Sequence, residues 1–213
     1  MDTTLPPALS DAAELDRLYS PPSALIQNAV RDHLTEFHLA YLRVATFFCL
    51  ASGSGDGLDA SPRGGPPGFV HALDAHTIAF ADWPGNNRIE SMRNLLRDDR
   101  VGLVFLFPGL DVFLRINGRG RVSTVPDLLE RVAEGQRRPV SAIVVAVEQV
   151  LFHCGKAIRR ARLWDPDARV DRSTLPSVGK MVAELGQVKE ISADQLDTLY
   201  ERGLKDDLYG GQK

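Results

Sequence analysis

The sequence contains few cysteines, little excess charge and no long hydrophobic run, and each shortage excludes a class of protein. Its only two cysteines, Cys49 and Cys154, are too few for a disulfide framework. Both lie beside apolar, strand-like residues, so we expect buried free thiols in a reducing cytoplasm. A net charge of -3 argues against a protein whose whole surface binds nucleic acid. No apolar run approaches the roughly 18 residues of a membrane span, and residues 1–4 lack the basic start of a secretory signal. We therefore expect a cytoplasmic protein that has neither nucleic acid nor a membrane as a partner.

The common catalytic and nucleotide-binding motifs are also missing. There is no glycine-lysine phosphate loop and no glycine-flanked serine elbow. The glycines of residues 53–57 are not followed by a helical pattern, so they predict a hairpin turn rather than a dinucleotide site. His33 and His38 would point to different faces of a helix, and His153 and Cys154 to opposite faces of a strand. We therefore expect no bound metal, and the catalytic residues stay unknown.

The length of 213 residues favours one domain with extensions. Residues 1–43 have a helical pattern and are expected to form an N-terminal extension that packs on the main domain, with helices over 12–19, over 23–30 and from Thr35. Residues 44–165 form the main domain. Residues 166–213 are expected to be a mostly helical C-terminal extension.

Short apolar runs separated by turn residues dominate the main domain and predict strands. The helices expected among them cover 87–97 and 126–133. Few helices among so many strands favour a mainly β fold with flanking α-helices, built as an antiparallel barrel or sandwich. Pro62 interrupts one run, which places that strand at an edge of the sheet. The predicted strands cover 44–51, 58–63, 69–73, 77–82, 101–107, 112–117, 119–125 and 140–153.

Two polar loops flank a predicted hairpin and together suggest an anion site. One spans residues 61–65, and the other spans residues 84–88 and leads into the helix expected from Asn87. A helix start offers unpaired amides that suit a phosphate, and Arg63 and Arg88 could add charge-assisted bonds. The alternative is an ordinary helix cap beside two exposed arginines, in a chain that has 20 arginines.

A basic cluster follows the last predicted strand, from Lys156 to Trp164. As a helix it would carry Lys156 and Arg160 on one side. It is either a solvated basic face over Trp164 or a second set of cations for an anionic ligand.

Three segments taken in order resemble a known family. They are Ser61-Pro62-Arg63-Gly64, the run Phe80-Ala81-Asp82-Trp83-Pro84-Gly85-Asn86-Asn87-Arg88, and Phe152-His153-Cys154-Gly155-Lys156-Ala157. Together they resemble the pyridoxamine 5′-phosphate oxidase-like flavoproteins, and most closely a bacterial subfamily of FMN-dependent enzymes. The resemblance covers roughly residues 25–167. It implies a six-stranded antiparallel split β-barrel and a homodimer that binds two FMN molecules in clefts between its subunits.

The resemblance also implies which residues bind the cofactor. The strand that contains Ser61 and Arg63 would meet the flavin phosphate and ring. The strand of residues 80–82 would flank the ring and the ribityl chain, and residues 87–88 in the loop after it would bind the phosphate. Lys156 belongs to the third segment, where the resemblance assigns it no definite role. The implied FMN-binding residues are Ser61, Arg63, Gly64, Phe80, Ala81, Asp82, Asn87, Arg88 and Lys156.

The chain also departs from the family's pattern. The lysine that closes the first FMN-binding strand is replaced by residues 64–67, Gly-Gly-Pro-Pro, and no C-terminal Arg/His substrate-binding segment is found. FMN binding therefore fits the chain better than vitamin B6 oxidation. We expect an FMN-dependent oxidoreductase of unknown small-molecule substrate. The alternatives are a flavin- or haem-binding protein without turnover, a deazaflavin-dependent reductase on the same fold, and a structural barrel without a cofactor.

Overall fold

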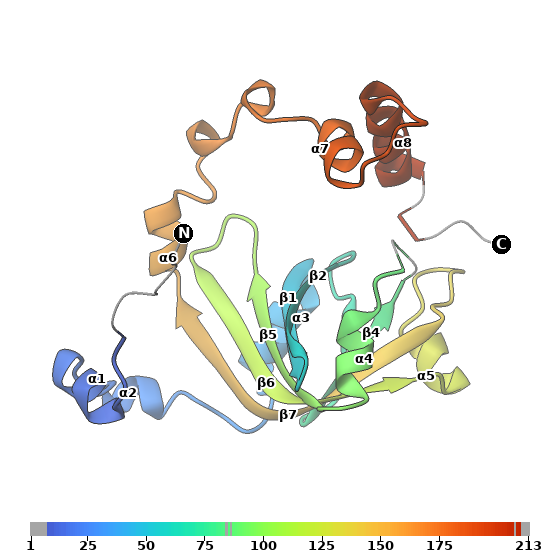
Figure 1. Ribbon diagram of the computed structural model, residues 1–213. Coiled ribbons are helices and arrows are strands. Elements are labelled where there is room, and N and C mark those ends of the chain that lie inside the picture. Colours follow the sequence, from blue (N-terminus) through green and yellow to red (C-terminus); the bar gives the residue numbers. More distant parts are fainter. Residues whose placement is uncertain (1–7, 84, 86, 207, 210–213) are drawn as a thin grey trace.

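The computed structural model describes residues 8–83, 85, 87–206 and 208–209, and it confirms a mainly β fold with flanking helices (Figure 1). The strands are β1 (Phe47–Ser54), β2 (Gly57–Gly64), β3 (Val70–Asp74), β4 (Thr77–Asp82), β5 (Arg100–Leu106), β6 (Val112–Ser123) and β7 (Ser141–Cys154). The α-helices are α1 (Ala12–Leu18), α2 (Ala24–Gln27), α3 (Glu36–Val44), α4 (Glu90–Leu95), α5 (Pro126–Arg131), α6 (Lys156–Ala161), α7 (Val178–Leu185) and α8 (Ala193–Asp206), and the short 3-10 helices are η1 (Pro166–Ala168) and η2 (Arg172–Thr174).

The strands form one antiparallel sheet in the order β2-β1-β5-β6-β7-β4-β3, which has seven strands where six were expected. The separate strands predicted over 112–117 and 119–125 are wrong, because β6 runs through both of them. Its register against β7 shifts between Asn117 and Gly118, where a β-bulge leaves Glu148 out of the pairing. A Cβ on Gly118 would lie 2.0 Å from the carbonyl oxygen of Ala146, so only glycine fits this close approach. The strand β6 therefore continues through Gly118 as far as Ser123.

The sheet curls until strands from its two ends meet in the core. The rings of Phe48 on β1 and Phe80 on β4 pack edge to face with centroids 4.9 Å apart, although β5, β6 and β7 lie between these two strands in the sheet order. Phe105 on β5 packs at the same distance from Phe48, and all three side chains are fully buried. Aromatic burial of this kind supplies much of the stability of a core. The curl brings β2 and β4 near each other without hydrogen-bonding them.

The helix expected over 87–97 is shorter than predicted, because it spans only Glu90–Leu95. Asn87 does not cap it: its φ of 59° lies in the left-handed region, and Ile89 occupies the N-cap position without a side-chain cap. Asparagine tolerates that conformation better than most residues. The segment before α4 is therefore a loop, and the phosphate site predicted at a helix start is wrong in that respect.

The N-terminal helices begin where their caps predict. Asp11 accepts from Ala13 N at the start of α1, and Thr35 caps α3. The helix predicted over 23–30 is wrong in length, because α2 covers only four residues. Neither α1 nor α2 contains a buried residue, whereas α3 buries His38 and Leu42 against the sheet.

Both cysteines are free, as expected, but the prediction that they are buried is wrong, because each is exposed. Strand alternation explains Cys49: Phe48 and Leu50 point into the core, so the residue between them points outward. Cys154 closes β7, where the last residues of the strand lie at the surface.

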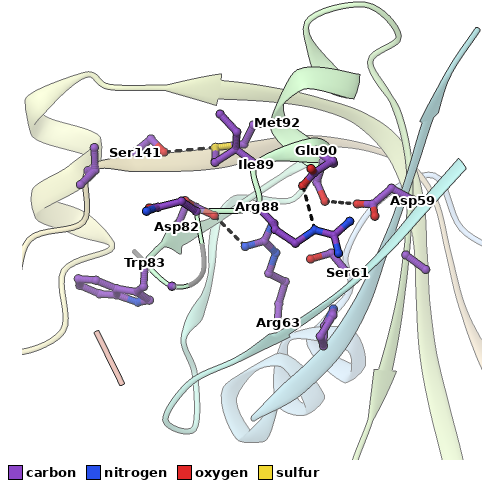
Figure 2. A pocket seen from close by; sticks show the side chains of 16 residues that line it. Asp59, Ser61, Arg63, Asp82, Trp83, Arg88, Ile89, Glu90, Met92 and Ser141 are labelled. Atoms are coloured by element: carbon purple, nitrogen blue, oxygen red, sulfur yellow. Dashed lines mark hydrogen bonds and ion pairs between the residues drawn. The ribbon is translucent and has the colours of Figure 1, made fainter. Parts of the chain in front are cut away.

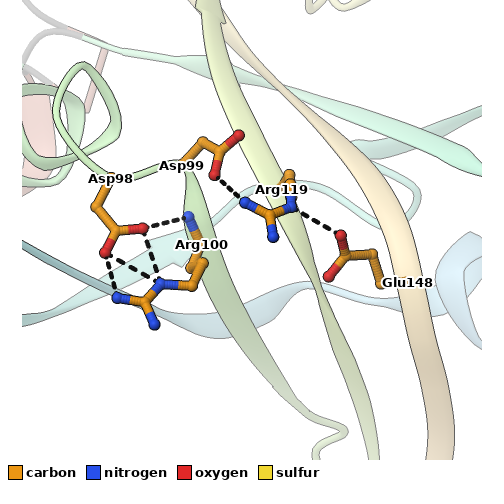
Figure 3. Close-up of polar contacts among 5 residues, drawn as sticks. All are labelled: Asp98, Asp99, Arg100, Arg119 and Glu148. Atoms are coloured by element: carbon orange, nitrogen blue, oxygen red, sulfur yellow. Dashed lines mark hydrogen bonds and ion pairs between the residues drawn. The ribbon is translucent and has the colours of Figure 1, made fainter.

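A group of charged side chains links the three central strands β5, β6 and β7 (Figure 3). Arg119 on β6 donates to Asp99 at 2.6 Å and to the bulged Glu148 on β7 at 2.8 Å. Beside it, hydrogen bonds from Arg100 lower the pKa of Asp98 to about 2. The arginines of these pairs are half-exposed or more, so each pair adds little to stability.

The C-terminal part continues from α6 through two short 3-10 turns to α7 and α8, which pack against each other. Figure 1 shows this pair set apart from the curled sheet. A Cβ on Gly179 would lie 2.1 Å from the carbonyl oxygen of Ala193, so the glycine allows α7 to approach α8 closely. Across the described ranges, no helix has the length and apolar character needed to cross a membrane.

His38 makes the stability of the fold depend on pH. Its Nδ1 accepts from the backbone N–H of Thr35 at 3.0 Å, its ring stacks on Phe152, and burial lowers its pKa below 6.5. The unfolded chain therefore binds a proton at this histidine more readily than the folded chain does. The contribution of His38 to stability is fully present above about pH 6.5 and is lost as the pH falls below that value.

A variant tests this pH dependence. His38→Gln keeps the acceptor of the capping box but cannot titrate. We expect the free energy of unfolding, measured with urea at about pH 7.5 and about pH 5.5, to fall less in the variant. An equal fall in both proteins would contradict the assignment.

Candidate functional site

A polar pocket lies between the end of β2, the end of β4, the loop before α4 and the start of β7 (Figure 2). Its volume is about 510 Å³, within the range of small-ligand sites. Of the loop residues predicted to bind an anion, Pro84 and Asn86 lie outside the described residues. The lining residues are Asp59, Ala60, Ser61, Pro62, Arg63, Asp82, Trp83, Gly85, Asn87, Arg88, Ile89, Glu90, Ser91, Met92, Val140 and Ser141.

The alternation of β2 directs three polar side chains into this pocket. Asp59, Ser61 and Arg63 are half-buried and share one face of the strand, while the residues between them are exposed. The helix α4 is attached to the same hairpin: Ser91 donates to Asp59 at 2.6 Å, and Asn94 donates to a serine of β1 at 3.2 Å. These bonds hold one wall of the pocket in place.

Arg63 and Asp82 form the most buried ion pair of the pocket. Arg63 Nη1 donates to Asp82 Oδ1 at 2.7 Å, and the two side chains are only 17% and 13% exposed. Burial raises the pKa of Asp82, and the positive charge of Arg63 opposes that rise. Arg63 Nε is buried and has no hydrogen-bond partner among the described residues. A buried donor of this kind costs free energy unless an acceptor reaches it.

Arg88 lies at the open side of the pocket. Its side chain is largely exposed, and its Nε lies 3.7 Å from Glu90 Oε2, which is a long contact for an ion pair. The pocket therefore holds two arginines against three carboxylates, those of Asp59, Asp82 and Glu90. An anionic group that binds here must compete with Glu90 for Arg88.

A second, more apolar pocket of about 400 Å³ adjoins the first. The two share Pro62, Arg63 and Trp83, so Arg63 lies at the boundary between them. We call it the aromatic pocket. Its lining residues are Pro62, Arg63, Gly64, Gly65, Phe69, Ala81, Trp83, Leu208 and Tyr209.

Most of the residues predicted to bind the cofactor meet at these two pockets. The polar pocket includes Ser61, Arg63, Asp82, Asn87 and Arg88, and the aromatic pocket adds Gly64 and Ala81.

Two predicted residues are placed elsewhere. The side chain of Phe80 is fully buried in the core and lines neither pocket. Lys156 opens α6 beyond the far end of β7, a strand of 14 residues or roughly 46 Å when extended. In Figure 1, α6 and α4 lie at opposite ends of the sheet. Lys156 therefore cannot complete the pocket of its own chain.

Several lining residues were not predicted. Asp59 had a signal in the sequence, because it lies two positions before Ser61 and therefore shares its strand face. Tyr209 had none, because it is 75 positions from its hydrogen-bond partner Glu134. Among the described residues no group of three or more histidine, cysteine or acidic side chains could hold a metal ion.

Comparison with known proteins identifies a family. The family model described as pyridoxamine 5′-phosphate oxidase matches residues 34–154, more than half of the chain. No curated protein matches the chain significantly.

Solved structures resemble the chain only at low identity. HupZ from Group A Streptococcus is 15% identical over 55% of this chain and 92% of its own, with a TM-score of 0.44. A putative pyridoxamine 5′-phosphate oxidase from Lactobacillus delbrueckii is 21% identical over 57% and 95%, with a TM-score of 0.43. Another from Listeria innocua is 19% identical over 54% and 93%, with a TM-score of 0.42.

The buried ion pair predicts how stability responds to its loss. Arg63→Met removes the cation and leaves the carboxylate of Asp82 desolvated, so we expect a loss of about 3–5 kcal/mol at neutral pH. The folded-state pKa of Asp82 then lies further above 3.8, so the folded state binds the proton more tightly. Relative to the parent, the variant should therefore regain stability as the pH falls from about 7.5 to about 5. Urea unfolding at both pH values measures this. Arg93→Met, on the exposed side of α4, is the control. A deficit that does not change with pH would contradict the coupling.

Proposed function

The chain belongs to the pyridoxamine 5′-phosphate oxidase family, and from this premise we propose that it is an FMN-dependent oxidoreductase of the bacterial subfamily it resembles. It would act on a small-molecule substrate and bind FMN in the polar pocket. The buried, unpartnered Nε of Arg63 is the observation that carries the proposal, because it presents a donor to an acceptor that the described residues do not supply.

The residues of the pocket suit the parts of FMN. The loop at Asn87 and Arg88 would take the phosphate, with Arg88 exchanging its long contact with Glu90 for a charge-assisted bond. Ser61 has a hydroxyl that can donate to a phosphate or ribityl oxygen. Arg63 would direct its Nε to an acceptor on the ligand while its Nη1 stays on Asp82.

When bound, FMN supplies the redox chemistry through its ring, so the chain's own groups bind, orient and exclude water. The pair of Arg63 and Asp82 keeps a positive charge fixed at the boundary between the two pockets. Trp83 and Phe69 line the aromatic pocket and would shield a ring there from water.

An apolar outer face of the sheet supports a homodimer. Cys49, Val104 and Leu151 belong to one row of residues that crosses β1, β5 and β7 on the outer face, with Arg115 of β6 between the last two. The neighbouring row contains Phe47, Leu106 and Phe113. An antiparallel sheet tolerates one solvated face when that face is polar, and these two rows are mostly apolar apart from Arg115 and His153. A second copy of the chain packed here would bury both rows and the exposed thiol of Cys49.

A dimer would also bring Lys156 to the ligand. The length of β7 keeps Lys156 away from the pocket of its own chain. A subunit packed across the sheet could direct its Lys156 to the pocket of its neighbour, so that FMN binds between subunits.

Arg88 provides the test of the phosphate site. A hydrogen bond to a charged group contributes roughly 1.5–3 kcal/mol, so Arg88→Ala should weaken FMN binding by about one to two orders of magnitude. Riboflavin lacks the phosphate, so its weaker affinity should barely change. Titration of protein with each ligand, followed by flavin fluorescence, measures both values.

Two matched variants sharpen this test. Glu90→Gln removes the competing carboxylate and should tighten FMN binding severalfold, whereas Arg93→Ala on the exposed side of α4 should change nothing. Equal losses for FMN and riboflavin in Arg88→Ala would refute the phosphate site.

Val104 tests the dimer and the shared site together. In sedimentation at micromolar protein, the parent should have about twice the chain mass of 23.4 kDa. Val104→Asp introduces a charge into the apolar outer face and should give a folded monomer with much weaker FMN binding, because the partner's contribution is lost. Leu185→Asp, at a residue 86% exposed at the end of α7 and away from the sheet, is the control and should stay dimeric. A folded monomer that binds FMN as tightly as the parent would exclude a site between subunits.

The spectrum and mass of the small molecule that co-purifies with the protein test the cofactor itself. FMN is expected. A deazaflavin or a haem would replace the proposal with one of its alternatives, and a colourless protein that takes up no flavin would refute it. Reduction of the bound flavin by NADPH, followed by reoxidation with substrate, would separate an enzyme from a binding protein.

A further inference from the structure

Tyr209, which follows α8 in the sequence, lies at the functional site. Tyr209 Oη donates to Glu134 Oε2 at 2.7 Å, and Trp83 Nε1 donates to the other oxygen of the same carboxylate at 3.1 Å. The rings of Tyr209 and Trp83 also meet edge to face, with centroids 5.0 Å apart. The guanidinium of Arg137 lies 4.5 Å from the centre of the Tyr209 ring. Glu134 also raises the pKa of Tyr209, which keeps the hydroxyl protonated as a donor.

These contacts place Tyr209 in the wall of the aromatic pocket. The opposite side of this pocket comes from β2, β4 and the segment after β2, through residues such as Gly64, Phe69 and Ala81. Among the described residues, Leu208 and Tyr209 are the lining residues that come from beyond α8. The outer wall is therefore a separate piece of chain, which hydrogen bonds, a cation and an aromatic contact hold in place.

We propose that Tyr209 is a removable outer wall of the aromatic pocket, which must leave Trp83 before a planar ring carrying an anionic group can bind or be released. Gly64 has no side chain and Ala81 has a small one, so they leave room for a flat ring. Trp83 and Phe69 would give that ring apolar contacts. Arg63 reaches both pockets, so one ligand can place its ring beside Tyr209 and its anionic group in the polar pocket. The proposal rests on the proposed function in one respect, because FMN is the ligand used to test it.

The first experiment needs no ligand. The chain has two tryptophans, so a Trp164→Phe background makes Trp83 the only tryptophan that fluoresces. Tyr209→Ala should uncover Trp83 and raise its acrylamide quenching constant about twofold or more relative to the same background with Tyr209. Tyr209→Phe keeps the ring but loses the hydrogen bond to Glu134, so its quenching constant should lie between those of the background and of Tyr209→Ala. Tyr200→Ala, at an exposed tyrosine of α8, should match the background. Equal quenching in all four proteins would overturn the proposal.

The second experiment measures FMN association and dissociation by stopped-flow fluorescence. If Tyr209 must move for the ligand to pass, Tyr209→Ala should speed both steps by about tenfold, so that the affinity changes much less than either rate. Tyr200→Ala should leave both rates unchanged. Faster dissociation with unchanged association would make Tyr209 an ordinary contact and overturn the proposal, as would two unchanged rates. A parent protein that binds no FMN would refute the proposed function, while the quenching measurement would still decide whether Tyr209 covers the pocket.

Discussion

The contact between Phe48 and Phe80 is the constraint on which the site depends. These rings meet only because the sheet curls far enough to bring β1 and β4 together across the core. The same curl places the end of β2 opposite the end of β4, which allows Arg63 to reach Asp82 although no backbone hydrogen bond joins the two strands. Both pockets lie at this junction. A flatter sheet would bury the same residues less well and would leave Arg63 and Asp82 apart.

The arginines and carboxylates at the junction of β2 and β4 nearly balance one another. An anion that binds there must therefore compete with carboxylates of the protein itself. Arg63 is neutralised by Asp82 and Arg88 faces Glu90, so neither arginine offers a charge without competition. Separation of the buried pair would leave a desolvated carboxylate and is costly, whereas the exposed contact between Arg88 and Glu90 costs little to break. The two arginines thus differ in kind: Arg63 provides a fixed donor, and Arg88 provides an exchangeable one.

Prediction from the sequence succeeded where a feature is local. The hairpin between β3 and β4, the helix cap at Thr35 and the edge position of the strand that contains Pro62 all follow from short patterns and are confirmed. It failed where a neighbouring strand decides the outcome. The strand predicted to end at residue 117 continues, because pairing with β7 carries β6 through Gly118, opposite the bulged Glu148. Asn87 suggested a helix cap, yet its left-handed backbone delays the helix to Glu90.

The sequence by itself determined the class of fold, because hydrophobic periodicity and turn residues are properties of neighbouring positions. It also identified Ser61, Arg63, Asp82, Asn87 and Arg88 as a candidate set, and these residues line one pocket. Only the tertiary structure decided that Phe80 lies in the core, that Cys49 faces outward and that Lys156 lies at the far end of β7. It alone brought Tyr209 to Trp83. These outcomes depend on contacts between segments distant along the chain, and no local pattern of residues specifies such contacts.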